Sequence, residues 1–289
     1  MNNLLELLLN PPTNLSLTTI LLFSYLLGIL HGITPDEHTW PITFSYAIGK
    51  YSTKGGMKAG FLFSLGFTLQ RSFLTTIGYL GLAYFYQKYN LDGPVYIVVG
   101  IVMAIAGSYI LKGKYLHIPI DELLRRRKSA QTENIRDIPL KMTIIHGLIA
   151  GFGFGAYASI ITFILAPQVG SLYFAPLPGM FFGLGTMTMQ IILGAFFGNL
   201  MRFKGLNEEQ MKSLASKAAG RTLYYGGIAF TIAGLLILGF PIIDNLSIPT
   251  GLIIPNLDAI DIGFLLVISV VGIIGVYSII KSYLEFKRS

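Results

Sequence analysis

Long uncharged stretches alternate with short polar ones along most of this chain. The stretches are about 20 residues or longer, and apolar residues do not alternate with polar ones inside them, which is typical of membrane-spanning helices rather than of β-barrel strands. The segments predicted to cross a bilayer are 16–49, 57–84, 93–112, 141–166, 176–200, 222–242 and 260–281. The pattern therefore predicts an all-α membrane protein with seven transmembrane segments.

Composition supports lipid as the solvent for most of the chain. Charged residues make up 12% of the sequence and hydrophobic residues 53%, whereas soluble domains carry about 25% charged residues. The sequence contains no cysteine, which excludes disulfides, thiolate metal sites and dithiol electron relays. A bound metal would therefore be held by imidazole, carboxylate, amide or backbone oxygen, or water.

Lysine and arginine residues are concentrated in alternate loops of the predicted topology. Of the 21 in the chain, almost all follow the first, third, fifth or seventh segment, and Lys88 lies in a loop on the other side. The positive-inside rule then predicts a plasma-membrane protein with its N-terminus outside and its C-terminus in the cytoplasm. This orientation accounts for the net charge of +7, so no nucleic-acid partner is expected.

Two segments are expected to lie outside the hydrocarbon core. Residues 1–15 are predicted to form an interfacial N-terminus. Residues 113–140 carry the basic run 125–128 and are predicted to form a cytoplasmic loop attracted to anionic lipid. A regulatory or partner-binding role for this loop is the alternative.

The two halves of the chain resemble each other at an offset of 119 residues. This offset aligns Gly28 with Gly147 and Phe63 with Phe182. Because each half contains three crossings, the second half is expected to be inverted relative to the first, as in many secondary transporters. The predicted units are the first membrane repeat at 16–112, the second at 141–242 and an additional transmembrane helix at 260–281.

The first helix of each repeat is predicted to be broken. Segment 16–49 has 34 residues and would be roughly 50 Å long as a straight helix, against a hydrocarbon core of about 30 Å. Pro35 disfavours helical geometry at Thr34 and donates no backbone hydrogen bond. The glycines of 151–155 weaken the second repeat at the corresponding place. Matching breaks indicate a binding site near the middle of the bilayer.

Four ionisable residues surround the first break: His31, Asp36, Glu37 and His38. Imidazole nitrogens together with carboxylate oxygens suit nickel, cobalt, zinc or manganese, and a kink would bring His31 and His38 close together. A structural interpretation is also open, because residues 34–37 have the pattern of an N-cap with a capping box. In that case the carboxylates serve only to start a helix.

Other polar residues lie in segments that are otherwise apolar. An unpaired arginine inside a membrane is costly, so Arg71 is expected to pair with Asp36 or Glu37, or to bind an anionic substrate. Gln70 and Gln190, interpreted as lying at related positions in the two halves, would supply amide oxygens or hold helices together. The candidate residues along a pathway are Glu37, Gln70, Arg71, His146, Thr188 and Gln190.

Residues 28–38, Gly-Ile-Leu-His-Gly-Ile-Thr-Pro-Asp-Glu-His, resemble the signature of nickel/cobalt transporters of the NiCoT and NicO types, within the wider LysE-like superfamily. Phe-Ser-Leu-Gly at 63–66 and Phe-Gly-Leu-Gly at 182–185 resemble two later motifs of that family. The resemblance implies that the ion ligands are His31, Asp36 and His38. The chain differs from the family pattern by one additional residue between Asp36 and His38.

These observations predict a secondary transporter of divalent transition-metal ions, nickel or cobalt, rather than an enzyme. The metal ion is its expected substrate, the lipid bilayer is its partner, no fixed cofactor is expected, and a homo-oligomer is compatible with the sequence. One alternative is a transporter of an anion or small organic solute with Arg71 as the binding charge. Another is an intramembrane metal-dependent enzyme with Glu37 as its base.

Overall fold

The structure is a computed structural model of the chain. It describes all residues except 1, 83–87, 89–90, 113–139, 204 and 289. The predicted cytoplasmic loop at 113–140 therefore lies, apart from its last residue, outside the described residues.

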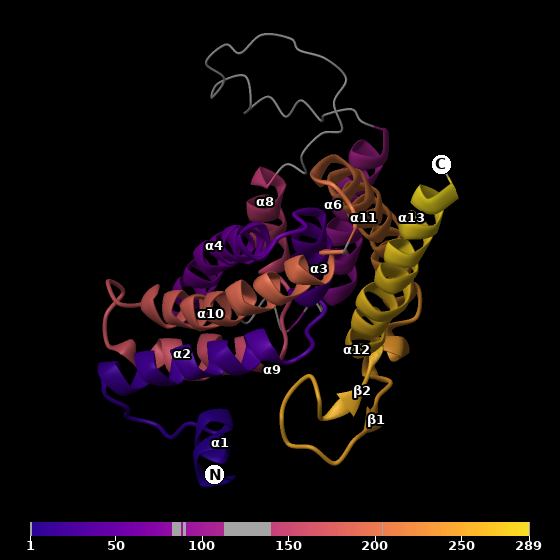
Figure 1. The fold of residues 1–289 in the computed structure, drawn as a ribbon. Coiled ribbons are helices and arrows are strands. Elements are labelled where there is room, and N and C mark those ends of the chain that lie inside the picture. The colour runs from indigo at the N-terminus through magenta and orange to yellow at the C-terminus, as the bar shows by residue number, and fades with distance from the viewer. Residues whose placement is uncertain (1, 83–87, 89–90, 113–139, 204, 289) are drawn as a thin grey trace, which may run out of the picture.

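Helices make up most of the described chain (Figure 1). The helices are α1 (Asn2–Leu9), α2 (Leu17–Ile33), α3 (Trp40–Gly49), α4 (Thr53–Tyr79), α6 (Asp92–Lys112), α8 (Lys141–Ala150), α9 (Ala156–Ser159), α10 (Leu177–Leu200), α11 (Glu208–Gly239), α12 (Ile262–Val267) and α13 (Val276–Arg288). Wider π-helical turns at Ile160–Leu165 and Ile268–Gly275 continue α9 and α12. The short strands β1 (Ile248–Pro249) and β2 (Ala259–Ile260) pair in antiparallel fashion.

Four helical spans in the described residues are long and apolar enough to cross a membrane. They are Asp92–Leu111, Leu177–Leu200, Glu208–Gly239 and Ile262–Lys287. Shorter apolar helices occur at Leu17–Ile33, Lys141–Ala150 and Ala156–Val169. The prediction of an all-α membrane protein is confirmed at this level.

The interruption in the first predicted segment lies at Pro35. Thr34 has an extended backbone and ends α2, with its hydroxyl donating to the Leu30 carbonyl oxygen at 2.9 Å. The next helix, α3, begins only at Trp40, and its N-cap residue Thr39 makes no side-chain cap hydrogen bond. The alternative interpretation of 34–37 as a capping box is therefore wrong, because Thr34 closes the preceding helix rather than opening the next one. The segment predicted as the first helix of the second repeat is interrupted as well, between Ala150 and Ala156.

Two groups of helices build the body of the structure. Helices α2, α4 and α10 lie side by side, and α6, α11 and α13 form a neighbouring group (Figure 1). Helix α11 begins earlier than the segment predicted at 222–242, because Asn207 and Gln210 form a capping box that starts it at Glu208. The Arg221 guanidinium then joins α11 to α13 through Glu285, with Nη2 2.7 Å from Oε2.

Glycines allow the closest helix crossings. A Cβ atom at Gly28 would overlap the carbonyl oxygen of Phe182 where α2 crosses α10. One at Gly147 would overlap the carbonyl oxygen of Phe63 where α8 crosses α4. The offset of 119 residues relates Gly28 to Gly147 and Phe63 to Phe182, so it converts one contact into the other.

The crossing of α4 and α10 is equally close and has the same relationship. A Cβ atom at Gly60 would overlap the carbonyl oxygen of Gln190, and one at Gly179 would overlap that of Arg71. At the offset of 119, Gln190 corresponds to Arg71. The sequence-based correspondence of Gln190 with Gln70 is therefore wrong by one residue.

Candidate cation site

The turn that joins α2 to α3 buries its ionisable side chains. His31, Asp36 and His38 are each 4% exposed, and Glu37 is half-buried. Asp36 Oδ1 accepts the backbone N–H of His38 at 2.9 Å, so the carboxylate fixes the turn that Pro35 begins. The interruption of the helix and the placement of the cluster therefore have one local cause.

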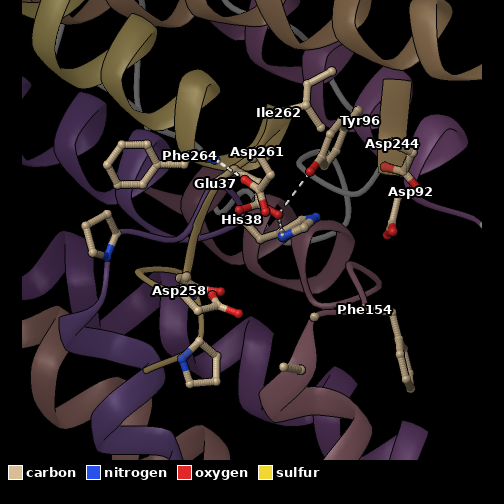
Figure 2. Close-up of a pocket in the computed structure, with 16 residues that line it drawn as sticks. Glu37, His38, Asp92, Tyr96, Phe154, Asp244, Asp258, Asp261, Ile262 and Phe264 are labelled. Atoms are coloured by element: carbon tan, nitrogen blue, oxygen red, sulfur yellow. Dashed lines mark hydrogen bonds and ion pairs between the residues drawn. The ribbon is translucent and has the colours of Figure 1, made fainter. Parts of the chain in front are cut away.

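A cavity of about 240 Å³ lies beside this turn (Figure 2). Glu37 and His38 line its wall together with further carboxylates. None of the described residues that line it is lysine or arginine. The additional acidic residues are Asp92, Asp244, Asp258 and Asp261. The cavity is therefore a region of negative potential that leads to the cluster and favours cations.

Asp261 shows the effect of this environment at the entrance to α12. Its Oδ1 accepts the N–H of Phe264 at 2.8 Å and caps the helix. Burial raises the pKa of the Asp261 carboxyl, and the nearby charges of Glu37 and Asp258 raise it as well. A cation in the cavity would oppose both effects.

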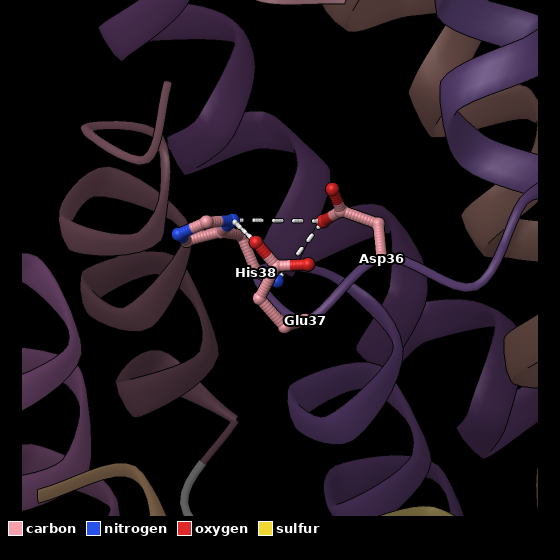
Figure 3. A group of neighbouring side chains, drawn as sticks. All are labelled: Asp36, Glu37 and His38. Carbon is pink, nitrogen blue, oxygen red and sulfur yellow. Dashed lines mark hydrogen bonds and ion pairs between the residues drawn. The ribbon is translucent and has the colours of Figure 1, made fainter. Parts of the chain in front are cut away.

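Three neighbouring side chains converge beside the cavity: Asp36, Glu37 and His38 (Figure 3). Of these, Glu37 and His38 line its wall. His38 Nδ1 lies 3.0 Å from Glu37 Oε1 and 3.9 Å from Asp36 Oδ1. One potential ligand atom from each residue lies within 4.8 Å of the other two. Such spacing allows a single cation to replace the direct contacts among them.

His31 approaches the same carboxylate from the last turn of α2. Its Nδ1 lies 3.6 Å from Asp36 Oδ2, and its ring stacks against both Phe67 and Phe182 at centroid distances of 5.5 and 5.1 Å. Neither Nε2 of His31 nor Nε2 of His38 has a hydrogen-bond partner among the described residues. Buried polar atoms without partners are uncommon in folded proteins and call for an explanation.

Contacts from distant segments hold the carboxylates. The Tyr96 hydroxyl on α6 donates to Glu37 Oε1 at 3.0 Å. Asn256 Nδ2, from the loop between β1 and β2, donates to Asp36 Oδ2 at 3.4 Å. A Cβ atom at Gly263 would contact the Glu37 carboxyl group. Sequence analysis missed these three residues, because no local pattern links them to a motif so far away in the chain.

Arg71 contacts the interruption between α8 and α9. Its Nη2 donates to the carbonyl oxygen of Gly153 at 2.8 Å, and its guanidinium lies 4.8 Å from the centre of the Phe67 ring. The same glycine packs against the His38 imidazole, which a Cβ atom at position 153 would overlap. The expected ion pair of Arg71 with Asp36 or Glu37 stays a prediction.

Gln190 makes a similar contact with the end of α2. Its Nε2 donates to the carbonyl oxygen of Gly32 at 3.2 Å, one residue before the end of α2. A backbone carbonyl near each interruption therefore accepts a hydrogen bond from the other half of the chain. The two donors, Arg71 and Gln190, are related by the offset of 119 residues. Gln70 is buried against Gly151, and neither atom of its amide has a hydrogen-bond partner among the described residues.

His146 and Thr188 are bonded to other groups. His146 Nδ1 lies 3.1 Å from the Tyr46 hydroxyl and 2.9 Å from the Met142 carbonyl oxygen. The Thr188 hydroxyl lies 3.1 Å from that of Tyr25. The hydrogen bonds described for these two residues do not connect them with the cluster at 36–38.

No protein-family model, curated protein or solved structure matches the chain. The fold and the site define a helical membrane protein with a buried cluster of imidazole and carboxylate groups.

Proposed function

We propose that this protein is a secondary transporter of divalent transition-metal ions, with nickel or cobalt as its substrate. The observation that carries the proposal is the convergence of Asp36, Glu37 and His38 at an interruption between two apolar helices. Two carboxylates and an imidazole form a donor set suited to a borderline divalent cation. Ionisable groups inside a membrane are costly and usually mark a substrate pathway.

The charges around the cluster favour a cation over an anion. The cavity beside it is lined by carboxylates, which repel anions. The Arg71 guanidinium, the binding charge of an anion transporter, donates one of its hydrogen bonds to the carbonyl oxygen of Gly153. These two observations support cation transport over the anion alternative.

The proposal includes an architecture of seven crossings in two inverted repeats, at 16–112 and 141–242, followed by the helix at 260–281. It is supported by the matched interruptions after α2 and α8 and by the paired crossings of α2 with α10 and α4 with α8. The hydrogen bonds from Arg71 and Gln190 to opposite breaks have the same symmetry. The chain lies in the plasma membrane, with its N-terminus outside and its C-terminus in the cytoplasm, as the basic residues indicate.

Rocking of one repeat against the other would then expose the ion to alternate sides of the membrane. In this mechanism the acidic cavity concentrates cations at the outer side. The ion displaces the contact between His38 and Glu37 as it binds. Arg71 and Gln190 hold the broken backbone segments on either side of the ion, because each donates to a carbonyl of the opposite repeat.

Cation flux into proteoliposomes tests the proposal. Purified protein should accumulate Ni²⁺ or Co²⁺ in preference to Mg²⁺, and Asp36→Asn and His38→Ala should each abolish this flux. Glu208→Gln provides the matched control, because Glu208 is an exposed carboxylate in the first turn of α11. Flux that persists unchanged in both site variants would contradict the ligand assignment.

A further inference from the structure

The hairpin between α11 and α12 sends one polar side chain into the candidate site. Asn256 Nδ2 lies 3.4 Å from Asp36 Oδ2 and 3.3 Å from Thr34 Oγ1. The Thr34 hydroxyl donates its proton to the Leu30 carbonyl oxygen, so it acts as an acceptor toward Asn256. The segment that follows the two proposed repeats thus contacts both the end of α2 and the buried carboxylate.

The hairpin holds Asn256 in this position. Ile248 pairs with Ile260 at its base, and the Thr250 N–H donates to the Asp258 carbonyl oxygen at 2.8 Å. Pro255 is buried and accepts a hydrogen bond from the Tyr157 hydroxyl at 3.3 Å. Asn256 itself has a left-handed backbone with φ of 66°, a conformation that asparagine tolerates better than most residues. The side chain is therefore aimed at the site before any ion binds.

The distances match the spacing of ligands around a single cation. Two ligands of a four-coordinate ion with bonds of about 2.0–2.1 Å lie about 3.3–3.4 Å apart. Asn256 Nδ2 and Asp36 Oδ2 have this separation, and His31 Nδ1 lies 3.6 Å from the same oxygen. Half a turn of the amide exchanges Nδ2 for Oδ1 with little change in shape. The exchange would present an oxygen ligand to an ion beside Asp36.

We infer that Asn256 supplies its amide oxygen as a ligand to the transported cation and that the 248–260 hairpin thereby closes the site on the side of the acidic cavity. The inference rests on the proposed function and adds a ligand from outside the motif at 31–38. In the structure, the amide nitrogen bonds to Asp36 and Thr34. The positive charge of a bound ion favours the opposite orientation of the amide, in which Oδ1 rather than Nδ2 faces the site. A neutral oxygen ligand adds no negative charge to a site that already contains two carboxylates.

Titration of purified full-length protein with Co²⁺ tests this inference through both affinity and the visible absorption of the bound ion. Asn256→Ala should weaken Co²⁺ binding at least about tenfold, the lower end for loss of a group around a metal site, and should change the absorption spectrum. Asn256→Asp restores an oxygen ligand and should recover most of the affinity. Asn245→Ala is the control, because Asn245 is exposed and its side-chain amide donates to the carbonyl oxygen of Pro241.

The spectrum separates ligation from a structural role, because a general loosening of the hairpin would not change the number or type of ligands on the ion. Unchanged affinity and spectrum in Asn256→Ala, with binding still lost in His38→Ala, would overturn the inference and leave the proposed function standing. Absence of Co²⁺ binding by the wild-type protein would overturn both. Elution of each variant as a single species from size-exclusion chromatography excludes misfolding as the cause.

Discussion

Tyr96 offers the sharpest test of how the cluster is held in place. Its hydroxyl donates to Glu37 Oε1 at 3.0 Å from α6, and its ring lies 5.4 Å from that of His38. Tyr96→Phe removes the hydroxyl and leaves the ring, so packing against His38 and Phe230 should persist. The change therefore isolates a single hydrogen bond.

The expected loss follows from the type of bond. A group that orients a metal-binding carboxylate or imidazole typically contributes a factor of about 10–100 in metal affinity, or about 1.4–2.8 kcal/mol. The lower part of this range is expected for Tyr96→Phe, because His38 Nδ1 contacts the same Glu37 oxygen at 3.0 Å. The remaining contact still restrains the carboxylate.

Calorimetric titration of Co²⁺ into detergent-purified protein measures the effect. Tyr277→Phe serves as the control, since Tyr277 on α13 is 55% exposed and lies away from the candidate site. Wild-type affinity in Tyr96→Phe would refute the view that Glu37 is a ligand held by α6. A loss of the same size in Tyr277→Phe would show that the method reports general destabilisation instead.

Two glycine substitutions separately test the packing of the candidate site and the packing of a helix crossing. Gly153→Ala should lower Co²⁺ affinity at least about tenfold, because the new methyl group overlaps the His38 imidazole. Gly239→Ala meets open space at the end of α11 and should bind as wild type; equal affinities of the two variants would contradict this. Gly147→Ala should lower the free energy of unfolding by about 1–3 kcal/mol, because the added methyl group overpacks the helix crossing. Thermal unfolding in detergent measures this loss. Gly239→Ala should unfold as wild type, because a methyl group there meets open space.

The sequence was sufficient to predict the local features of the site. Pro35 explained where the first helix ends, and four ionisable groups in an apolar segment identified the cluster. Spacing along the chain also indicated that a kink would bring His31 and His38 close together, and their Nδ1 atoms lie 3.6 and 3.9 Å from the Asp36 carboxylate oxygens. Features of this kind are predictable because each depends on residues close together in sequence.

Long-range contacts were beyond such reasoning. Tyr96 and Asn256 are ordinary residues in their own segments, and only the packing of α6 and the hairpin brings them to the carboxylates. The capping-box interpretation failed because Thr34 faces back toward Leu30. Propensity alone does not distinguish the end of one helix from the start of the next.

The most direct test of the central claim is the location of Co²⁺ in crystals of the protein by anomalous X-ray scattering. The account predicts one ion in contact with the His38 imidazole and with a carboxylate oxygen of Asp36 or Glu37. An ion bound elsewhere, or an empty cluster in crystals grown with saturating Co²⁺, would contradict it.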